Sequence, residues 1–374
     1  MQIENYSILN NVLFFAVFSC LAAFILAPLL IHFLYKLKIR RSFAFGEVKG
    51  IGQRLIKTGT PIMGGLLIVI TVMIINLIFN WNQRFTYIPL GVMCLAAFLG
   101  AWDDIKNIFG KKRYLRSFGQ TLKLIRVHKS KLTRLGLVLS LPWTAFKNIF
   151  HIFSRQPTRG ALPHEKIILQ FIAGAITAWW IVFKLGPDWL YIWVPFNGEI
   201  YLGYWMIPII IFIVIFLANA VNISDGLDGL AGGSLISAFG GLTIISYFQG
   251  NLPFSILNAT VIGALLAYVY FNIKPARFQM GDVGSLAMGA LFAVIMLAQN
   301  RLVLIPFFGF IFIVEILSVI LQIIWRYGLG KRLFKMAPIH HHLEILGWSE
   351  EKIVMRFWVI NLFMVIFGLW LALH

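Results

Sequence analysis

The chain alternates between long apolar segments and shorter polar ones. A helix that crosses the hydrocarbon core of a bilayer needs about 20 apolar residues. The pattern therefore predicts an all-α polytopic membrane protein with about ten transmembrane helices. These helices are expected at residues 11–35, 63–81, 86–102, 167–185, 205–219, 229–248, 254–271, 283–300, 302–326 and 354–373. No internal repeat is apparent, so residues 1–374 are expected to form a single domain.

Residues 109–165 interrupt this pattern with a basic stretch in which apolar residues are interleaved. One interpretation is a solvated, partly unstructured loop. The other is a set of helices that lie on anionic lipid headgroups, as basic amphipathic helices do. Pro142 and the lack of acidic partners argue against a further span. The stretch is expected to be an insertion in the domain, and both interpretations stay open.

The composition excludes several other classes of protein. Hydrophobic residues make up 60% of the 374 residues and charged residues only 12%, whereas soluble domains are about 25% charged. So few charges cannot cover a soluble surface, which excludes a soluble enzyme and a disordered chain. The net charge of +18 indicates acidic partners, but the long apolar segments exclude nucleic acid as the partner. Cys20 and Cys94 lie within apolar segments, so neither disulfides nor a cysteine metal site is expected.

Lysine and arginine orient the predicted helices, because positive charge is retained in cytoplasmic loops. Of the 32 basic residues, 29 fall in loops that follow odd-numbered segments, and only Arg84, Lys184 and Arg301 fall in the other loops. This asymmetry predicts that both termini are periplasmic and that the insertion at about 109–165 is cytoplasmic. The first apolar segment is expected to be retained, because it is longer than the apolar part of a signal peptide.

Acidic residues are rare, and five of the 14 form three compact groups on the predicted cytoplasmic side. The groups are Asp103 with Asp104, Asp225 with Asp228, and Asp282. Adjacent carboxylates repel one another unless a cation or a proton relieves them. Carboxylate oxygens are also ligands that Mg²⁺ prefers, usually together with phosphate oxygens. The pattern therefore favours a site for magnesium and phosphate over five unrelated helix caps.

Three histidines, His340, His341 and His342, lie in the last predicted cytoplasmic loop. Adjacent histidines can bind a metal, donate to phosphate oxygens or transfer protons, although the other ligands of a zinc site are missing. Glu315 lies within the segment 302–326, where a carboxylate is costly and is usually functional or paired. Neither a P-loop nor a dinucleotide-binding fingerprint is present, which disfavours nucleoside-triphosphate chemistry.

Together these motifs resemble those of the bacterial phospho-N-acetylmuramoyl-pentapeptide transferases. That family belongs to the polyprenyl-phosphate N-acetylhexosamine-1-phosphate transferase superfamily. The resemblance runs from about residue 36 to the C-terminus, apart from 109–165. The matching segments are Lys57–Gly65, Asp103–Asp104, Asn219–Gly233, Phe271–Leu286 and Ala337–Glu344. The forms Gly-Thr-Pro-Ile-Met-Gly-Gly and Pro-Ile-His-His-His are similar to the muramoyl branch of the superfamily rather than to the N-acetylglucosamine-1-phosphate branch.

The resemblance implies a reaction and its location. Undecaprenyl phosphate would attack the β-phosphorus of UDP-N-acetylmuramoyl-pentapeptide at the bacterial inner membrane, and lipid I and UMP would form with Mg²⁺ as the cofactor. Such phosphoryl transfer needs positioning and charge neutralisation more than covalent chemistry. The implied fold has ten helices with both termini outside. The implied partners are the two substrates and membrane lipid, and a homodimer is the alternative to a monomer.

The resemblance also implies roles for individual residues. Asp103, Asp104 and Asp282 would be catalytic, with Asp103 activating the lipid phosphate and Asp282 binding Mg²⁺, while Asp225 is an alternative metal ligand. The expected substrate-binding residues are Lys57, Asn222, Asp225, Asp228, Asn272, His340, His341 and His342. These residues do not distinguish direct attack by the lipid phosphate from a path through an aspartyl-phosphate intermediate.

Two positions depart from the pattern of the family, and two alternative functions stay open. Ile62 stands where a hydroxyl residue is usual, and Gln279 stands where Phe is usual, so the contacts of those residues are not carried over. The same fold could act on UDP-N-acetylglucosamine, which the histidine triplet opposes. A transporter or flippase would place its ionisable groups near the bilayer midplane, whereas these acids lie at one boundary.

Overall fold

Helices form most of the described chain, as the apolar pattern predicts. The structure is a computed structural model that describes residues 2–40, 59–111, 117–151 and 160–374. The long helices and the strands, in chain order, are α1 (Gln2–Lys36), α2 (Leu66–Phe79), α3 (Tyr87–Phe109), α4 (Phe118–Val127), α5 (Lys131–Leu139), α6 (Leu141–His151), α7 (Pro163–Trp180), β1 (Tyr191–Val194), β2 (Gly198–Tyr201), α8 (Met206–Ser224), α9 (Leu230–Phe248), α10 (Leu252–Asn272), α11 (Gly281–Ala298), α13 (Phe310–Leu329) and α15 (Glu350–Ala372). The short helical segments are η2 (Ile181–Leu185), η3 (Pro187–Leu190), η4 (Gly203–Trp205), η5 (Leu302–Leu304), α12 (Ile305–Phe308) and α14 (Ile339–Ile345).

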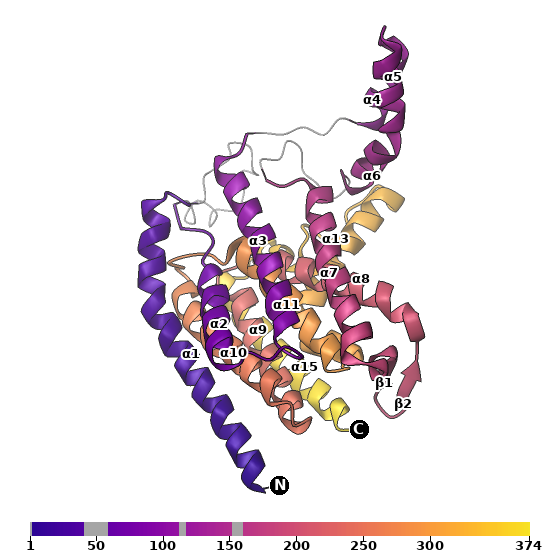
Figure 1. Ribbon diagram of the computed structural model, residues 1–374. Helices are drawn as coiled ribbons and strands as arrows, with labels where there is room; N and C mark the ends of the chain where they lie inside the picture. Colours follow the sequence, from indigo (N-terminus) through magenta and orange to yellow (C-terminus); the bar gives the residue numbers. More distant parts are fainter. Residues whose placement is uncertain (1, 41–58, 112–116, 152–159) are drawn as a thin grey trace.

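The helices confirm an all-α polytopic membrane protein. Within the described ranges, nine helices are long and apolar enough to cross a bilayer. The predicted segment 63–81 forms α2, which has only 14 residues. The two shortest predicted segments, 86–102 and 205–219, become α3 and α8 with 23 and 19 residues. Figure 1 shows both ends of the chain toward the same end of the bundle, which agrees with an even number of crossings.

The helix α11 forms the centre of the bundle and carries Asp282 in its first turn. Its residues from Val283 to Ala298 are all buried, and it packs against α3 and α8. Small residues let helix backbones approach one another closely in membranes. Gly289 is such a residue, because a side chain there would overlap the Leu217 carbonyl oxygen of α8. The neighbours of α11 are therefore protein along its whole length.

The basic insertion contains three short helices, α4, α5 and α6. Ser117 and Gln120 form a capping box at the start of α4, and Ser130 caps α5. Figure 1 shows α4 and α5 beyond the end of the main bundle, and α6 is anchored to α7 by a ring contact between Trp143 and His164 at 5.5 Å. The stretch 118–151 is thus helical, as the second interpretation expected, and none of its helices is long enough to span a bilayer. Its contact with lipid stays a prediction.

The predicted segment 302–326 is not one helix. The segment η5 and the short helix α12 come first, and α13 begins only after Gly309. The amide nitrogen of Ile311, one residue into α13, donates to Asn361 Oδ1 of α15 at 3.2 Å. A side chain on a distant helix therefore satisfies a backbone group at the break. The run contains Pro306 and Gly309, residue types that favour a break, but the partner Asn361 lies 50 residues further along the chain.

The strands β1 and β2 form a small antiparallel hairpin between α7 and α8. Tyr191 pairs with Tyr201 and Val194 pairs with Gly198. These strands were not predicted, because each has only four residues and no long alternating pattern. In Figure 1 the hairpin lies at the same end of the bundle as the C-terminus.

Two segments that are far apart in the sequence pair beside the start of α11. Gln279 N donates to the Pro61 carbonyl at 2.9 Å, and Gly64 N donates back to the Gln279 carbonyl at 2.7 Å. Gly65 N donates to the Met280 carbonyl at 2.9 Å. A side chain at Gly65 would overlap the backbone of Gly284, so this close pairing requires glycine. The pairing fixes the backbone that leads into α11.

Candidate active site

Three aspartates meet at the first turn of α11. Asp104 accepts hydrogen bonds from Asp282 N at 3.2 Å and from Val283 N at 3.1 Å. Asp225 accepts one from Gly281 N at 3.2 Å. Gly281 has a φ of 71°, a left-handed conformation that favours glycine. Carboxylates are favourable at a helix N-terminus, so Asp104 and Asp225 fix the turn that carries the Asp282 side chain.

Lys166 connects two of the residues that were expected to be catalytic. Its Nζ lies 2.5 Å from Asp103 Oδ2 and 2.8 Å from Asp282 Oδ2. Asp103 is buried, and it also accepts hydrogen bonds from the Ala161 amide and from Asn107 Nδ2. An ammonium group between two carboxylates relieves their repulsion. The two aspartates, which lie on α3 and α11, are thus held together by a cation from α7.

Lys166 was not predicted as a site residue, and in the sequence it is one of many cations in the predicted loops. The signal that could have identified it is its position directly before the apolar segment 167–185. A lysine at such a boundary usually extends toward water, so the position alone does not predict two carboxylate partners, of which Asp103 is buried and Asp282 half-buried.

The loop between α8 and α9 is held by side chains from two other helices. Asp228 N donates to Glu350 Oε1 of α15 at 2.8 Å. Gly229 N donates to Asn272 Oδ1 of α10, also at 2.8 Å. Asn272 Nδ2 in turn donates to the Phe278 carbonyl at 2.8 Å. Asn272 therefore joins the loop to the backbone that precedes α11, and both polar atoms of its amide are used by the protein.

Asn222 lies at the end of α8, next to the first turn of α11. Its Oδ1 accepts a hydrogen bond from Ser285 Oγ at 3.3 Å. Ser285 also donates to the Gly281 carbonyl at 3.0 Å. Asn222 is half-buried, so part of its side chain is accessible beside the acidic residues. Its role in substrate binding stays a prediction.

The three histidines have different polar partners, although the rings of His340 and His341 contact each other with 4.1 Å between their centroids. His340 is buried, and its Nδ1 lies 2.8 Å from Glu315 Oε2. His341 pairs with Glu344, with 2.6 Å between Nδ1 and Oε2. The partner of the third ring is a backbone group, because His342 Nδ1 accepts a hydrogen bond from the Lys335 amide at 3.2 Å. Each ring thus has a different partner.

His340 is the histidine that faces the loop between α8 and α9. Within the described ranges its Nε2 has no hydrogen-bond partner, and a side chain at Gly226 would touch this atom. Glu315, whose role the sequence left open, is therefore a buried partner that orients the His340 ring. A carboxylate that accepts from one ring nitrogen fixes which nitrogen faces outward.

The acidic residues fit a hard divalent cation. Asp103 and Asp282 each direct a carboxylate oxygen at a single cationic atom, Lys166 Nζ. Within the described ranges, no group of three or more His, Cys, Asp or Glu side chains surrounds one metal position. Protein-bound Mg²⁺ commonly uses one or two carboxylates and completes its shell with water and substrate phosphate. The pair is therefore sufficient as the protein's share of such a site.

The structure thus divides the expected site residues into groups. Asp103, Asp104, Asn222, Asp225 and Asp282 lie together at the first turn of α11. A second group, formed by Asp228, Asn272 and His340, surrounds the adjoining loop, whereas His341 and His342 have other partners. Lys57 lies outside the described residues.

The chain is similar to known proteins along most of its length. Residues 160–300 match the family described as glycosyl transferase family 4. A phospho-N-acetylmuramoyl-pentapeptide-transferase of Chloroflexus aurantiacus is 36% identical over 87% of this chain and 80% of its own length. Proteins of the same name from Staphylococcus saprophyticus and Staphylococcus aureus are 34% and 32% identical. Each of these two covers 96% of this chain, and this chain covers 98% and 99% of them.

Proposed function

The chain belongs to the phospho-N-acetylmuramoyl-pentapeptide-transferase family, and from this we propose that it transfers phospho-N-acetylmuramoyl-pentapeptide from UDP-N-acetylmuramoyl-pentapeptide to undecaprenyl phosphate. The products are lipid I and UMP, in the first membrane step of peptidoglycan synthesis. The single observation that carries this proposal is the similarity to transferases of that name over nearly the full length of both chains. The acidic residues at the first turn of α11 supply the chemistry that such a transfer needs.

The proposal includes an orientation in the bacterial inner membrane. The loops that hold 29 of the 32 basic residues would face the cytoplasm, and both termini would face the periplasm. The acidic residues would then lie at the cytoplasmic boundary of the bilayer. That is where a lipid phosphate, held by its chain in the membrane, can meet a soluble nucleotide. The observation that supports this orientation is the charge asymmetry.

The proposed role of each acidic residue follows from its contacts. Asp282 would hold Mg²⁺, which when bound would neutralise charge on the diphosphate and on the departing UMP. Asp103 would orient and activate the lipid phosphate, because its carboxylate faces the same cationic position as Asp282. Asp104 would keep Asp282 in place through the two amides that it accepts from. Lys166 would contribute positive charge to the phosphates that enter between the two carboxylates.

The substrate-binding residues would lie on either side of these carboxylates. Asn222 and Asp225 would contact the nucleotide, since they lie beside the first turn of α11. His340 would present Nε2 to an oxygen of the substrate, because Nδ1 is already occupied by Glu315.

The two alternative functions are less well supported. The relatives carry the muramoyl name, and the histidine triplet is of the muramoyl form, which disfavours UDP-N-acetylglucosamine as the substrate. A transporter would place its ionisable groups near the middle of the bundle, whereas Asp282 lies in the first turn of α11. Neither alternative has a specific observation in its favour.

The test is a measurement of UMP release by the purified protein. Release is expected with UDP-N-acetylmuramoyl-pentapeptide, undecaprenyl phosphate and Mg²⁺ together, and loss is expected when any one is left out or when EDTA is added. UDP-N-acetylglucosamine in place of the muramoyl substrate should give no lipid-linked product. A product formed from UDP-N-acetylglucosamine alone would assign the chain to the other branch of the superfamily.

A further inference from the structure

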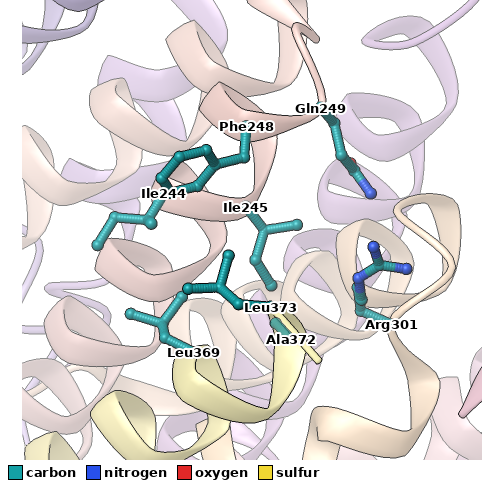
Figure 2. A pocket seen from close by; sticks show the side chains of 8 residues that line it. All are labelled: Ile244, Ile245, Phe248, Gln249, Arg301, Leu369, Ala372 and Leu373. Carbon is teal, nitrogen blue, oxygen red and sulfur yellow. The ribbon is translucent and has the colours of Figure 1, made fainter. Parts of the chain in front are cut away.

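A cavity of about 130 Å³ lies at the end of α11 that is remote from Asp282. The 18 residues of α11 rise by about 27 Å, so this cavity is separate from the acidic residues. It lies between the last turns of α9 and α15 and the loop that follows α11. Figure 2 shows Gln249 and Arg301 on one side of it and Ile244, Phe248 and Leu369 on the other. The cavity is therefore polar on one side and apolar on the other.

Arg301 supplies the charge of this cavity. Its guanidinium group lies over the Trp193 ring of β1, 4.2 Å from the ring centroid. One N–H donates to the Asn300 carbonyl at 3.1 Å, but Nε has no partner within the described ranges. The ion pairs found in those ranges do not include Arg301. A partly buried guanidinium group without a carboxylate partner is a favourable place for an anion.

The charge balance of Arg301 supports the same conclusion. Burial lowers the pKa of Arg301. The negative charge of Glu199 on β2 raises this pKa, but by less than burial lowers it. Arginine nevertheless keeps its charge in proteins. An anion beside the guanidinium group would therefore relieve an unfavourable burial of charge.

The polar side of the cavity is held in place by further hydrogen bonds. Gln249 Nε2 donates to the Gln299 carbonyl at 2.9 Å. Gln299 Nε2 donates to Ser246 Oγ at 2.6 Å, while Gln299 Oε1 has no partner within the described ranges. The turn after α9 is thus tied to the end of α11, and the position of Arg301 relative to the apolar wall is fixed.

The apolar side of the cavity opens to the outside of the bundle. Ile244, Phe248 and Leu373 are 43%, 67% and 66% exposed. All three belong to the ends of apolar helices or to the residue that follows one, so their surroundings in a membrane are lipid chains. A ligand that enters here would have an apolar part in the bilayer and an anionic part at Arg301.

We propose that this cavity binds the phosphate group of a lipid, with Arg301 as the anion-binding residue and the lipid chain against Ile244, Phe248 and Leu373. The planar guanidinium group matches the geometry of phosphate oxygens. Pockets that enclose a whole small-molecule ligand measure about 300–1,000 Å³. This smaller cavity takes only the phosphate, and the rest of the lipid lies in the bilayer. The lipid is either a bulk phospholipid or a polyprenyl phosphate.

The test compares lipid binding by the wild-type protein and by Arg301→Gln. Each purified protein would be titrated separately with phosphatidylglycerol, undecaprenyl phosphate and diacylglycerol, and the bound lipid would be counted by native mass spectrometry. Arg301→Gln is expected to weaken the extra phosphate-lipid binding by at least about tenfold, since hydrogen bonds to charged groups are among the strongest in proteins. Lys184→Gln is the matched control, because Lys184 is exposed and also lies over an indole ring, that of Trp179.

The lipid arms identify the source of the phosphate. A loss for phosphatidylglycerol alone supports a bulk phospholipid, and a loss for undecaprenyl phosphate alone supports the polyprenyl lipid. Equal binding of both phosphate lipids by wild type and Arg301→Gln would overturn the proposal. It would also fail if wild type bound diacylglycerol as well as the phosphate lipids.

A second variant keeps the test decisive if Arg301→Gln disturbs the contact with Trp193 and does not fold. Leu373→Trp would fill the mouth of the cavity from an exposed position and leave Arg301 unchanged. The same loss of lipid is expected, while UMP release should stay within about twofold of wild type because the acidic residues are remote. Lipid binding at the wild-type level in a folded Leu373→Trp protein would contradict the proposal.

Discussion

The ammonium group of Lys166 lies 2.8 Å from Asp282 Oδ2. The carboxylate that is proposed to hold Mg²⁺ is therefore already paired with a cation of the protein. A metal ion that binds Asp282 must share this carboxylate with Lys166 or displace it, because both are attracted by the same negative charge. The affinity for Mg²⁺ and the rate of transfer are therefore both expected to depend on Lys166.

The first prediction concerns Lys166→Gln. The apparent affinity for Mg²⁺ should rise, because the competing cation is gone. The maximal rate should fall by about 10²-fold, since a positioned charge beside the phosphates is lost. The measurement is a titration of UMP release against Mg²⁺ concentration. Lys106→Gln is the control, because the Lys106 ammonium group lies 3.8 Å from Glu165 and over the Trp102 ring, and not between Asp103 and Asp282. An unchanged Mg²⁺ titration in Lys166→Gln would contradict the competition.

The second prediction concerns the two carboxylates that share Lys166. Asp282→Asn and Asp103→Asn should each lower UMP release by at least about 10²-fold, the scale of a positioned catalytic group. Both substitutions keep the size of the side chain, so the loss would come from charge. Asp188→Asn is the control, because Asp188 is exposed and is distant in the sequence from both Asp103 and Asp282. Near-normal turnover of purified Asp282→Asn would show that this residue does not hold the metal.

The third prediction separates Asp104 from these two residues. Asp104 caps α11 through the amides of Asp282 and Val283, so Asp104→Ala should lower the unfolding free energy by about 1 kcal/mol as well as the activity. Asp104→Asn keeps one acceptor oxygen and should recover part of the stability. The measurement is the midpoint of thermal unfolding in detergent. If Asp104→Ala melts like wild type, the capping role is wrong.

The fourth prediction ranks the histidines. His340→Ala should lower activity by about tenfold or more, because it removes a buried ring that faces the loop with Gly226 and leaves Glu315 without a partner. His342→Ala should change activity by less than about threefold, since this ring contacts the Lys335 amide and the Phe334 ring. The measurement is the steady-state rate of UMP release by each variant. Equal losses in the two variants would contradict this ranking and indicate that the histidines act as one functional unit.

The fifth prediction concerns Asn272, which was expected to contact substrate. Asn272→Ala would leave Gly229 N and the Phe278 carbonyl without their partner, which costs about 1–3 kcal/mol when such groups are buried. The unfolding midpoint should fall, while the KM for the nucleotide in the remaining folded protein should change little. A raised KM without a loss of stability would indicate that Asn272 contacts the substrate.

Much of the fold follows from the sequence because the bilayer imposes a simple rule on it. A spanning segment must be apolar and about 20 residues long. The segments that form α7, α9 and α10 could therefore be recognised from the sequence. The hydrogen bond that Ile311 N donates to Asn361 Oδ1 of α15, beside the break at Gly309, could not be recognised, because Asn361 lies 50 residues further along the chain. The strands β1 and β2 are too short to have a pattern.

The site was predicted in part for a similar reason. Carboxylates are rare in this chain, so Asp103, Asp225 and Asp282 could be recognised as site candidates. All three also lie on the predicted cytoplasmic side. Lysines are common, so nothing in the sequence singled out Lys166, which contacts Asp282 across 116 positions. Pairings over such separations depend on how α7 packs between its neighbours, and an isolated sequence does not contain that packing.

The burial of α11 has a consequence for the membranes in which the enzyme can work. About 89% of its apolar window is enclosed by protein, compared with 17%, 28% and 33% for α1, α13 and α15. When a bilayer is thinner or thicker than a protein prefers, the resulting force acts on the helices that touch lipid. That force would act on the peripheral helices, whereas Asp282 belongs to α11, which is enclosed by protein and not by lipid. The depth of Asp282 in the membrane should therefore stay constant as lipid chain length varies with growth temperature.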